Sequence, residues 1–514
     1  MSVAVFASRI LGLVREQVFA ALFGAGRAMD AFVVAYRIPN LLRDLFAEGA
    51  LSTAFVTVFS RQEQRLGLAR TWRLANNVLA WLCLVVGAIT LVGIFLAEPL
   101  VNLMAPAFGR IPGKLELTAQ LTRIMFPFLL FVSLAALVMG VLNTRGKFFL
   151  PALAPSFYNL GSIIGGVSLT LAAPFFGWQP IVGMALGTLL GGFLQMAVQL
   201  PLLFRVGYRP QWVLDLKDEG LRQVLKLMVP AVVGLSATQI NVFINTFYAA
   251  RCMEGSVAWL NYAYRLVHLP QGLFGVALSV ATLPLLSRCA AAHDLPALKG
   301  ALASSLNLAM LVTIPAALGL MALSTPICAV IFEHGRFTAF DTAQTAQALI
   351  YYSLGLLAFA GVKIMVPAFY ALNDTRLPVL GSFLTVAANF VCINLTLAAL
   401  GHRAIALSTS LSMVVNLLFL GVMLHRKLAG LPLASLLRTL AQVTGAALLM
   451  AGAVYLAHGW LSAWMGPGLL ARLMVLAACI ILGLALYGLA VQALGVQAWR
   501  DLAQQMRLRS SGEQ

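Results

Sequence analysis

The sequence predicts an all-α polytopic membrane protein with about fourteen transmembrane helices, arranged as two six-helix lobes and two further C-terminal helices. Composition, long apolar segments and an internal repeat predict this class. Of the 514 residues, 61% are hydrophobic and 10% are charged, whereas soluble domains carry about 25% charged residues. Because unpaired backbone polar groups are costly in hydrocarbon, a chain that spans a membrane is helical or a closed barrel. The length of the apolar segments favours helices.

Windowed hydropathy places the spans in order along the chain. The first lobe holds 3–24, 30–58, 75–97, 119–143, 149–174 and 180–204. The second lobe holds 223–249, 256–285, 302–331, 343–372, 378–400 and 404–424, and the two C-terminal spans are 437–458 and 469–494. The first span and the first half of the second are weakly hydrophobic and amphipathic. Pro39, followed by Asn40, predicts a break in the second span.

The cations of the loops predict the orientation of the chain. Of the 34 lysines and arginines, 20 fall in loops that are cytoplasmic if the N-terminus is inside, and seven fall in outer loops. This split predicts that both termini lie in the cytoplasm. The same rule accounts for the net charge of +17. Because aromatic and basic residues are not interleaved as in proteins that stack bases, we expect no nucleic-acid partner.

An internal repeat relates the two lobes. An Ala-Tyr-Arg triplet ends at Arg37 in the second span and recurs at Arg265 in the eighth, while Asn143 recurs as Asn373. These offsets cover six spans, an even number, so both lobes insert in the same orientation as a parallel repeat. The predicted domains are the N-lobe 1–206, a cytoplasmic amphipathic linker 207–221, the C-lobe 222–428, the last two spans in 429–497, and a cytoplasmic tail 498–514.

Ionisable residues concentrate in the first two spans. They are Arg9, Arg15, Glu16, Asp30, Arg37, Arg43, Asp44 and Glu48. A charge at the centre of a membrane helix costs about 2.5 to 3.5 kcal/mol, so such residues face a wet cavity or a partner. Arginine stays charged and holds phosphate oxygens bidentately, which predicts a cationic pocket between the lobes for a phosphate or pyrophosphate. The alternative is a set of buried ion pairs that lock the helices together, and it is stronger for Asp44 and Glu48.

Helical spacing groups the polar residues into stripes. The stripes are Arg9 with Gly12 and Glu16, Asn40 with Arg43, and Asn261 with Arg265 and His268. The eighth span, which is the repeat equivalent of the second, therefore directs a cation of its own toward the predicted pocket.

The sequence has no recognisable metal-binding or nucleotide-binding motif. The six cysteines show no C-x-x-C spacing, the histidines show no metal-ligand spacing, and no phosphate-binding loop is found. We therefore expect no cofactor, no metal and no direct use of ATP, and coupling through the membrane potential or an ion. A glycosyltransferase would need acidic loops, but the outer loops are nearly free of acids except around Glu333 and Asp341. The sequence favours a transporter over an enzyme.

Short motifs with a recognisable order run through the whole chain. They include 8–15 (SRILGLVR), 23–26 (FGAG), 30–32 (DAF), 39–43 (PNLLR), 48–50 (EGA), 262–266 (YAYRL), 335–338 (GRFT) and 374–378 (DTRLP). These segments resemble the MurJ (MviN) family of lipid II flippases. That family belongs to the MOP exporter superfamily, whose members have two six-helix lobes; its flippases carry two extra helices.

The resemblance implies a flippase of the bacterial inner membrane that moves lipid II from the inner to the outer leaflet by alternating access. It implies a central cavity lined by Arg9, Arg15, Asp30, Arg43 and Arg265, in which Arg9, Arg15 and Arg265 meet the pyrophosphate. Secondary candidates are Glu16, Asn40, Glu48, Asn261 and His268. The last two spans would form a groove for the polyprenyl tail.

The expected partners are lipid II, membrane lipids and, as a further possibility, enzymes of cell-wall synthesis. The alternative function is export of another polyprenyl-linked glycan, or of drugs, within the same superfamily. An exporter of cationic drugs would need an acidic cavity, whereas the residues expected here are mainly arginines.

Overall fold

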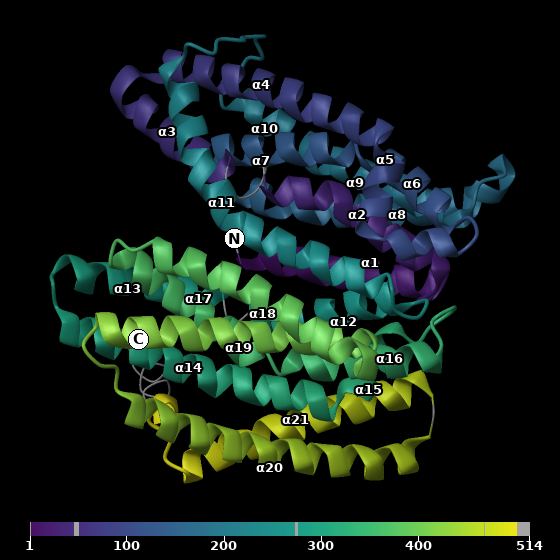
Figure 1. Ribbon diagram of the computed structural model, residues 1–514, viewed down its shortest axis with the longest axis vertical. Coiled ribbons are helices and arrows are strands. Elements are labelled where there is room, and N and C mark those ends of the chain that lie inside the picture. The colour runs from purple at the N-terminus through teal and green to yellow at the C-terminus, as the bar shows by residue number, and fades with distance from the viewer. Residues whose placement is uncertain (1, 46–50, 273–275, 467, 501–514) are drawn as a thin grey trace. The chain divides into compact units, whose positions relative to one another are not determined.

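The computed structural model describes residues 2–45, 51–272, 276–466 and 468–500, in which every regular element is a helix (Figure 1). This confirms the predicted all-helical class. The helices form two compact units, Met1–Ala258 and Trp259–Gln514. The boundary between the units differs from the predicted division into lobes, which places the seventh span in the second lobe. The predicted lobes describe the repeat, and they stay a prediction.

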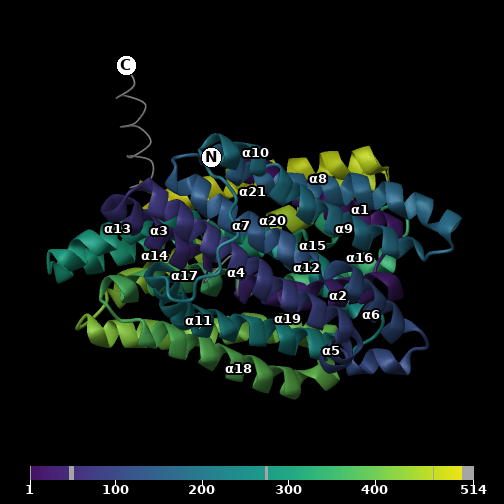
Figure 2. The ribbon, with the colours of Figure 1, turned by 90° about the horizontal axis from the view of Figure 1, so that it is seen from above.

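Within its described residues, the first unit contains eleven complete α-helices and the start of a twelfth. They are α1 (Ser2–Phe23), α2 (Arg27–Arg43), α3 (Ser52–Leu66), α4 (Leu68–Phe95), α5 (Ala97–Met104), α6 (Lys114–Met125), α7 (Phe128–Thr144), α8 (Phe149–Ala172), α9 (Pro180–Ala197), α10 (Leu200–Arg205) and α11 (Glu219–Ala249). Helix α12 (Ser256–Pro270) begins in this unit and continues into the second. The long helices of the unit run roughly along one direction (Figures 1 and 2).

Glycines allow α8 and α9 to approach each other very closely. A Cβ atom on Gly187 would overlap the backbone of Gly166, and one on Gly183 would overlap the backbone of Thr170. Small residues at such an interface let two backbones come together in a membrane, where apolar burial alone does not drive helix association. On the other side of the unit, α3, α4 and α7 enclose buried aromatic and aliphatic side chains such as Phe55.

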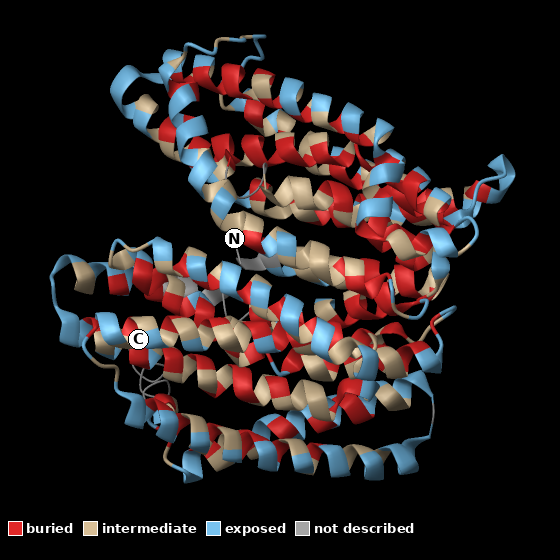
Figure 3. Cartoon of the chain, in the orientation of Figure 1, coloured by how far each residue is buried: buried red, intermediate tan, exposed pale blue. Residues whose placement is uncertain are grey.

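The second unit contains the remaining helices. They are α13 (Val276–Ala291), α14 (Leu295–Ala322), α15 (Ser324–Phe332), α16 (Ala339–Ser353), α17 (Leu356–Ala371), α18 (Arg376–Leu400), α19 (His402–Lys427), α20 (Leu433–Met465) and α21 (Leu469–Ala493). The last pair packs against α14 and α15 through apolar side chains. The hydroxyl of Tyr487 donates to the carbonyl of Leu311 at 2.6 Å. Buried and exposed residues alternate along these helices (Figure 3).

Within the described residues, ten helices are long and apolar enough to cross a membrane, or eleven if the bent pair α16 and α17 is one span. The predicted spans outside this set are the first, the second and the eighth. These three contain the ionisable residues assigned to the site, so the chain is least apolar where its charges gather. The predicted total of fourteen spans and the orientation of the termini stay predictions.

Two local predictions were wrong. Helix α2 continues through Pro39 and ends at Arg43, because one proline removes a single backbone hydrogen bond and the packed neighbours hold the helix together. The predicted span 302–331 is two helices that meet at Leu323, whose φ of −106° and ψ of 19° are not helical. Hydropathy gives no sign of this break because both sides of it are apolar.

Candidate functional site

Arg15 of α1 is buried in the first unit with an acid and aromatic rings around it. Its Nη2 donates to Glu16 Oε1 at 2.7 Å, and both residues are buried. The guanidinium carbon lies 5.1 Å from the ring centre of Tyr158 on α8 and 5.8 Å from that of Phe19. Ring faces attract cations, so the ion pair and the rings together allow an arginine to be buried in an apolar helix.

The guanidinium of Arg15 keeps hydrogen-bonding capacity. Its buried Nε has no hydrogen-bond partner among the described residues, and leaving a buried donor unsatisfied costs about 1 to 3 kcal/mol. Arginine offers five N–H donors in a planar fork that fits phosphate and carboxylate oxygens. This donor set is suited to an anion.

Arg9 lies less than two turns before Arg15 on the same helix and is half-buried. In the part of the chain that the structure describes, it has no hydrogen-bond or ion-pair partner. The predicted stripe joined Arg9 to Glu16, but the carboxylate of Glu16 is bonded to Arg15. Within the stripe, Gly12 lies against Asn159 of α8, whose Nδ2 donates to the carbonyl of Ser8 at 3.0 Å.

Asp30 lies near the start of α2 and is buried with a full set of partners. Its Oδ2 accepts from Lys114 Nζ at 3.0 Å and from the backbone N–H of Gly255 at 2.8 Å. Its Oδ1 accepts from the backbone N–H of Ala258 at 3.0 Å. The amino group of Lys114 also lies 4.2 Å from the ring centre of Phe108. Asp30 was predicted to line the substrate cavity; here it joins α2, α6 and the start of α12.

The starts of α2 and α12 cap each other. While Asp30 accepts from the first turn of α12, Glu254 Oε1 accepts from the backbone N–H of Arg27 at the start of α2, at 3.0 Å. Arg27 also donates from its side chain to the carbonyl of Pro112. A carboxylate at a helix N-terminus satisfies free N–H groups and favours the helix dipole. The two helix starts are therefore fixed to one another within the first unit.

The last residues of α2 form a more open cluster. Arg43 donates to Asp44 Oδ1 from Nε at 3.1 Å and from Nη2 at 2.8 Å, and all the side chains of the cluster are partly exposed. Asn40 Nδ2 lies 3.4 Å from Asp44 Oδ2, and Gln239 Nε2 of α11 lies 3.5 Å from the same oxygen, both of which are long contacts. Asn40 and Arg43, predicted to share a stripe, thus both contact Asp44.

The remaining candidates lie on α12 beyond the unit boundary or outside the described residues. Asn261 is half-buried, and Arg265 and His268 are exposed. The rings of His268 and Tyr264 meet edge to face, with centres 4.2 Å apart. Glu48 lies outside the described residues.

Metal-binding side chains do not cluster in the described part of the chain, where no group of three or more His, Cys, Asp or Glu could hold an ion. The candidate site is therefore described by its cations and its hydrogen-bond donors.

Sequence reasoning missed Lys114, Tyr158 and Asn159. Lys114 was counted among the outer-loop cations, but it begins α6 with its amino group buried against Asp30. Tyr158 and Asn159 lie on an apolar helix, where nothing local marks them. Gly12 on α1 was at most a weak signal, since small residues are enriched where membrane helices pack and Asn159 lies against it.

The described residues form an all-helical chain with many apolar spans, and one of its least apolar helices buries Arg15 with an unused donor; these features are those of a membrane transporter. The family model of the lipid II flippase MurJ matches residues 19–476. The lipid II flippase MurJ of Burkholderia cenocepacia is 37% identical over 93% of this chain and 93% of its own length. The chain belongs to the MurJ family of lipid II flippases.

Solved structures agree with this assignment. A structure described as lipid II flippase MurJ in an inward closed conformation is 27% identical, covers 96% of this chain and 99% of its own, and superposes with a TM-score of 0.77. An inward-facing multidrug resistance MATE transporter of the MOP superfamily matches with a TM-score of 0.68 over 82% of this chain and 94% of its own; at 15% identity it shows a shared fold alone. The protein is thus a polytopic transporter of the bacterial inner membrane, not an enzyme.

Proposed function

We propose that this protein flips lipid II, the lipid-linked precursor of peptidoglycan, from the inner to the outer leaflet by alternating access. Curated relatives that are named as lipid II flippases match this chain over nearly their whole length. Lipid II carries a pyrophosphate, an anion of the kind that arginine forks bind. The observation that carries the proposal is Arg15, a buried cation with a donor left unused by the described residues.

The arginines divide into two roles. Arg15 is held in place by Glu16 and by the ring of Tyr158, so its fork is preorganised for the pyrophosphate. Arg9 and Arg265 have more exposed side chains and complete the recognition of the headgroup. Arg43, whose charge is balanced by Asp44, is a further contact along the path of the headgroup.

Coupling through the membrane potential is the expected energy source. Moving one elementary charge through 100 mV is worth about 2.3 kcal/mol, so a cationic site responds to the potential. The two C-terminal helices α20 and α21 are the proposed groove for the polyprenyl tail. Membrane lipids and cell-wall synthesis enzymes are the further partners that we propose.

The test replaces the flippase of a bacterium by this gene and scores growth together with lipid II exposure on the outer leaflet. We expect the wild-type gene to rescue growth, Arg15→Ala to abolish rescue, and Arg15→Lys to lose most of it. Lysine keeps the charge opposite Glu16 and so preserves the fold, but it lacks the planar fork. Arg65→Ala, at an exposed arginine near the end of α3, is the matched control and should rescue fully.

Each result has a distinct meaning. Suppose that Arg15→Lys rescues normally and that the Arg15→Ala protein is absent from the membrane. Arg15 would then serve only to hold helices together, and its role in pyrophosphate binding would be refuted. Failure of the wild-type gene, with the protein confirmed in the membrane, would favour another polyprenyl-linked glycan as the substrate.

A further inference from the structure

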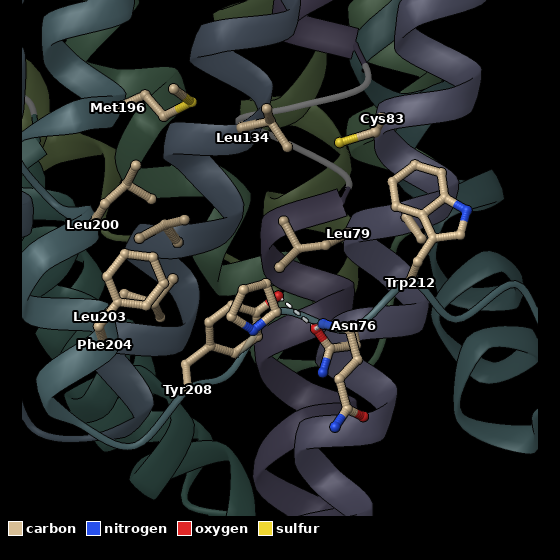
Figure 4. A pocket seen from close by; sticks show the side chains of 14 residues that line it. Asn76, Leu79, Cys83, Leu134, Met196, Leu200, Leu203, Phe204, Tyr208 and Trp212 are labelled. Atoms are coloured by element: carbon tan, nitrogen blue, oxygen red, sulfur yellow. Dashed lines mark hydrogen bonds between the residues drawn. The ribbon is translucent and has the colours of Figure 1, made fainter.

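The first unit contains an apolar pocket that the proposed flipping mechanism does not use. It has a volume of about 320 Å³ and lies among α4, α7, α9, α10 and the segment 206–218 that follows them (Figure 4). Cys83, Leu134 and Met196 line one end, and Tyr208 and Asn76 line the other (Figure 4). A volume of this size lies at the lower end of the range for ligand pockets.

The polar groups at the Asn76 end are largely engaged with one another and with the backbone of the segment 206–218. Asn76 Oδ1 accepts from the hydroxyl of Tyr208 at 2.6 Å and from the backbone N–H of Gln211 at 3.0 Å. Asn76 Nδ2 donates to the carbonyl of Arg209 at 3.1 Å. Burial raises the pKa of Tyr208 to about 12, with a smaller contribution from nearby Cys83, so the hydroxyl stays protonated and keeps donating. The pocket therefore favours an apolar occupant.

The shape of the pocket suits an alkyl chain. Asn76 and Cys83 are two turns apart on α4, so the pocket extends about 10 Å along the helix. The Asn76 end adjoins the segment 206–218, which the distribution of cations predicts to be cytoplasmic. The Cys83 end lies within the apolar part of the span. An occupant thus enters from the inner-leaflet interface and points toward the bilayer centre.

An exposed tryptophan lines the pocket, and exposed arginines lie next to lining residues in the sequence. Trp212 is 70% exposed, and aromatic residues of this kind anchor proteins at the level of lipid headgroups. Arg205 and Arg209 are direct sequence neighbours of the lining residues Phe204 and Tyr208, and both arginines are exposed. Arg73 lies one turn before Asn76 and contacts Asp215 at 3.6 Å. Exposed arginines at the inner leaflet attract anionic lipid headgroups.

We propose that this pocket holds one acyl chain of an anionic phospholipid of the cytoplasmic leaflet, with the headgroup at Arg205 and Arg209. The site lies in the first unit, whereas the tail groove proposed for the substrate lies on α20 and α21. The bound lipid packs α4 and α10 against the segment 206–218 and supports this face of the unit.

The experiment counts lipids bound to the intact protein by native mass spectrometry after transfer to detergent with phosphatidylglycerol or phosphatidylcholine. We expect the wild type to retain one phosphatidylglycerol more tightly than phosphatidylcholine. Arg205→Ala and Arg209→Ala should each weaken phosphatidylglycerol about fivefold and leave phosphatidylcholine unchanged. Arg65→Ala is the matched control and should bind both lipids as the wild type does.

A second variant fills the apolar part of the site. Leu79→Trp places a large ring in the pocket and should abolish retention of the lipid, while Leu91→Trp, at an exposed position of the same helix outside the pocket, should not. Should Leu79→Trp fail to fold, the two arginine variants still decide the question. Equal retention of the two lipids by the wild type would overturn the proposal. Full displacement of phosphatidylglycerol by polyprenyl phosphate would also overturn it, because the pocket would then belong to the substrate.

Discussion

Two aspartate–lysine pairs, one in each unit, show how differently the same chemistry is used. Lys114 Nζ lies 3.0 Å from Asp30 Oδ2, with 1% and 2% of the two side chains exposed. Lys427 Nζ lies 2.6 Å from Asp374 Oδ2, with 33% and 17% exposed. The second pair is shorter, but water screens it and each partner can be solvated alone. Burial, not distance, makes the first pair indispensable, because neither charge can be left without the other.

The difference also separates two uses of charge in a membrane protein. Asp30 accepts hydrogen bonds from three donors, Lys114, Gly255 and Ala258, and all three are buried. Asp374 accepts from two backbone N–H groups at the start of α18 and from Lys427 near the end of α19. The first carboxylate fixes helices inside the unit, whereas the second caps a helix at its surface.

The largest expected effect comes from removing a lysine. Lys114→Met leaves a buried carboxylate without its cation, so we expect the free energy of unfolding to fall by about 3 to 5 kcal/mol. The same change at Lys427 should cost about 1 kcal/mol or less. Denaturant titration in mild detergent measures both. Combining Lys114→Met with Asp30→Asn should restore part of the loss of stability. Equal losses for the two lysine variants would show that burial does not distinguish the two pairs.

A smaller effect is expected at Glu254, the exposed carboxylate that caps the start of α2. Glu254→Ala removes the acceptor for the Arg27 backbone N–H, and loss of such a cap costs about 1 kcal/mol. Glu254→Gln keeps an acceptor and should recover most of it. Hydrogen exchange at the Arg27 amide, faster in the alanine variant than in the glutamine variant, is the measurement. Unchanged exchange in both variants would show that this cap contributes nothing to the stability of α2.

The smallest effect is a dependence on pH at the exposed pair. The hydrogen bond from Lys427 holds the pKa of Asp374 below its ordinary value, with backbone N–H groups adding to the shift and partial burial opposing it. The stabilisation is present above the unfolded-state pKa of about 3.9 and is lost as the pH falls through the lower pKa of the folded protein. Thermal unfolding between pH 6 and about pH 3 should therefore show a smaller acid-induced loss for Asp374→Asn than for the wild type. Parallel curves would contradict this contribution.

Hydropathy and charge predicted the fold class and the helices on which the charges lie, because both are properties of one segment at a time. Pairing depends on segments far apart in the chain, and it was not predicted. Lys114 and Asp30 are 84 positions apart, and no periodicity joins them. Even Arg15 and Glu16, adjacent in sequence, were assigned to different roles because the spacing rule for helices favours partners three or four positions apart. Long side chains can satisfy each other outside that rule.

The mutual capping of α2 and α12 has a consequence for the history of the repeat. In the predicted repeat, Arg27 and Gly255 are equivalent positions, 228 residues apart like Arg37 and Arg265, and each donates its backbone N–H to a carboxylate from the other predicted copy. Gly255 has a φ of 93°, which favours glycine, whereas an arginine occupies the equivalent position. If the repeat arose by duplication, the effect of a substitution in one copy depends on the residue that it contacts in the other copy. Divergence at these helix starts should therefore be correlated among relatives, with paired changes more frequent than single ones.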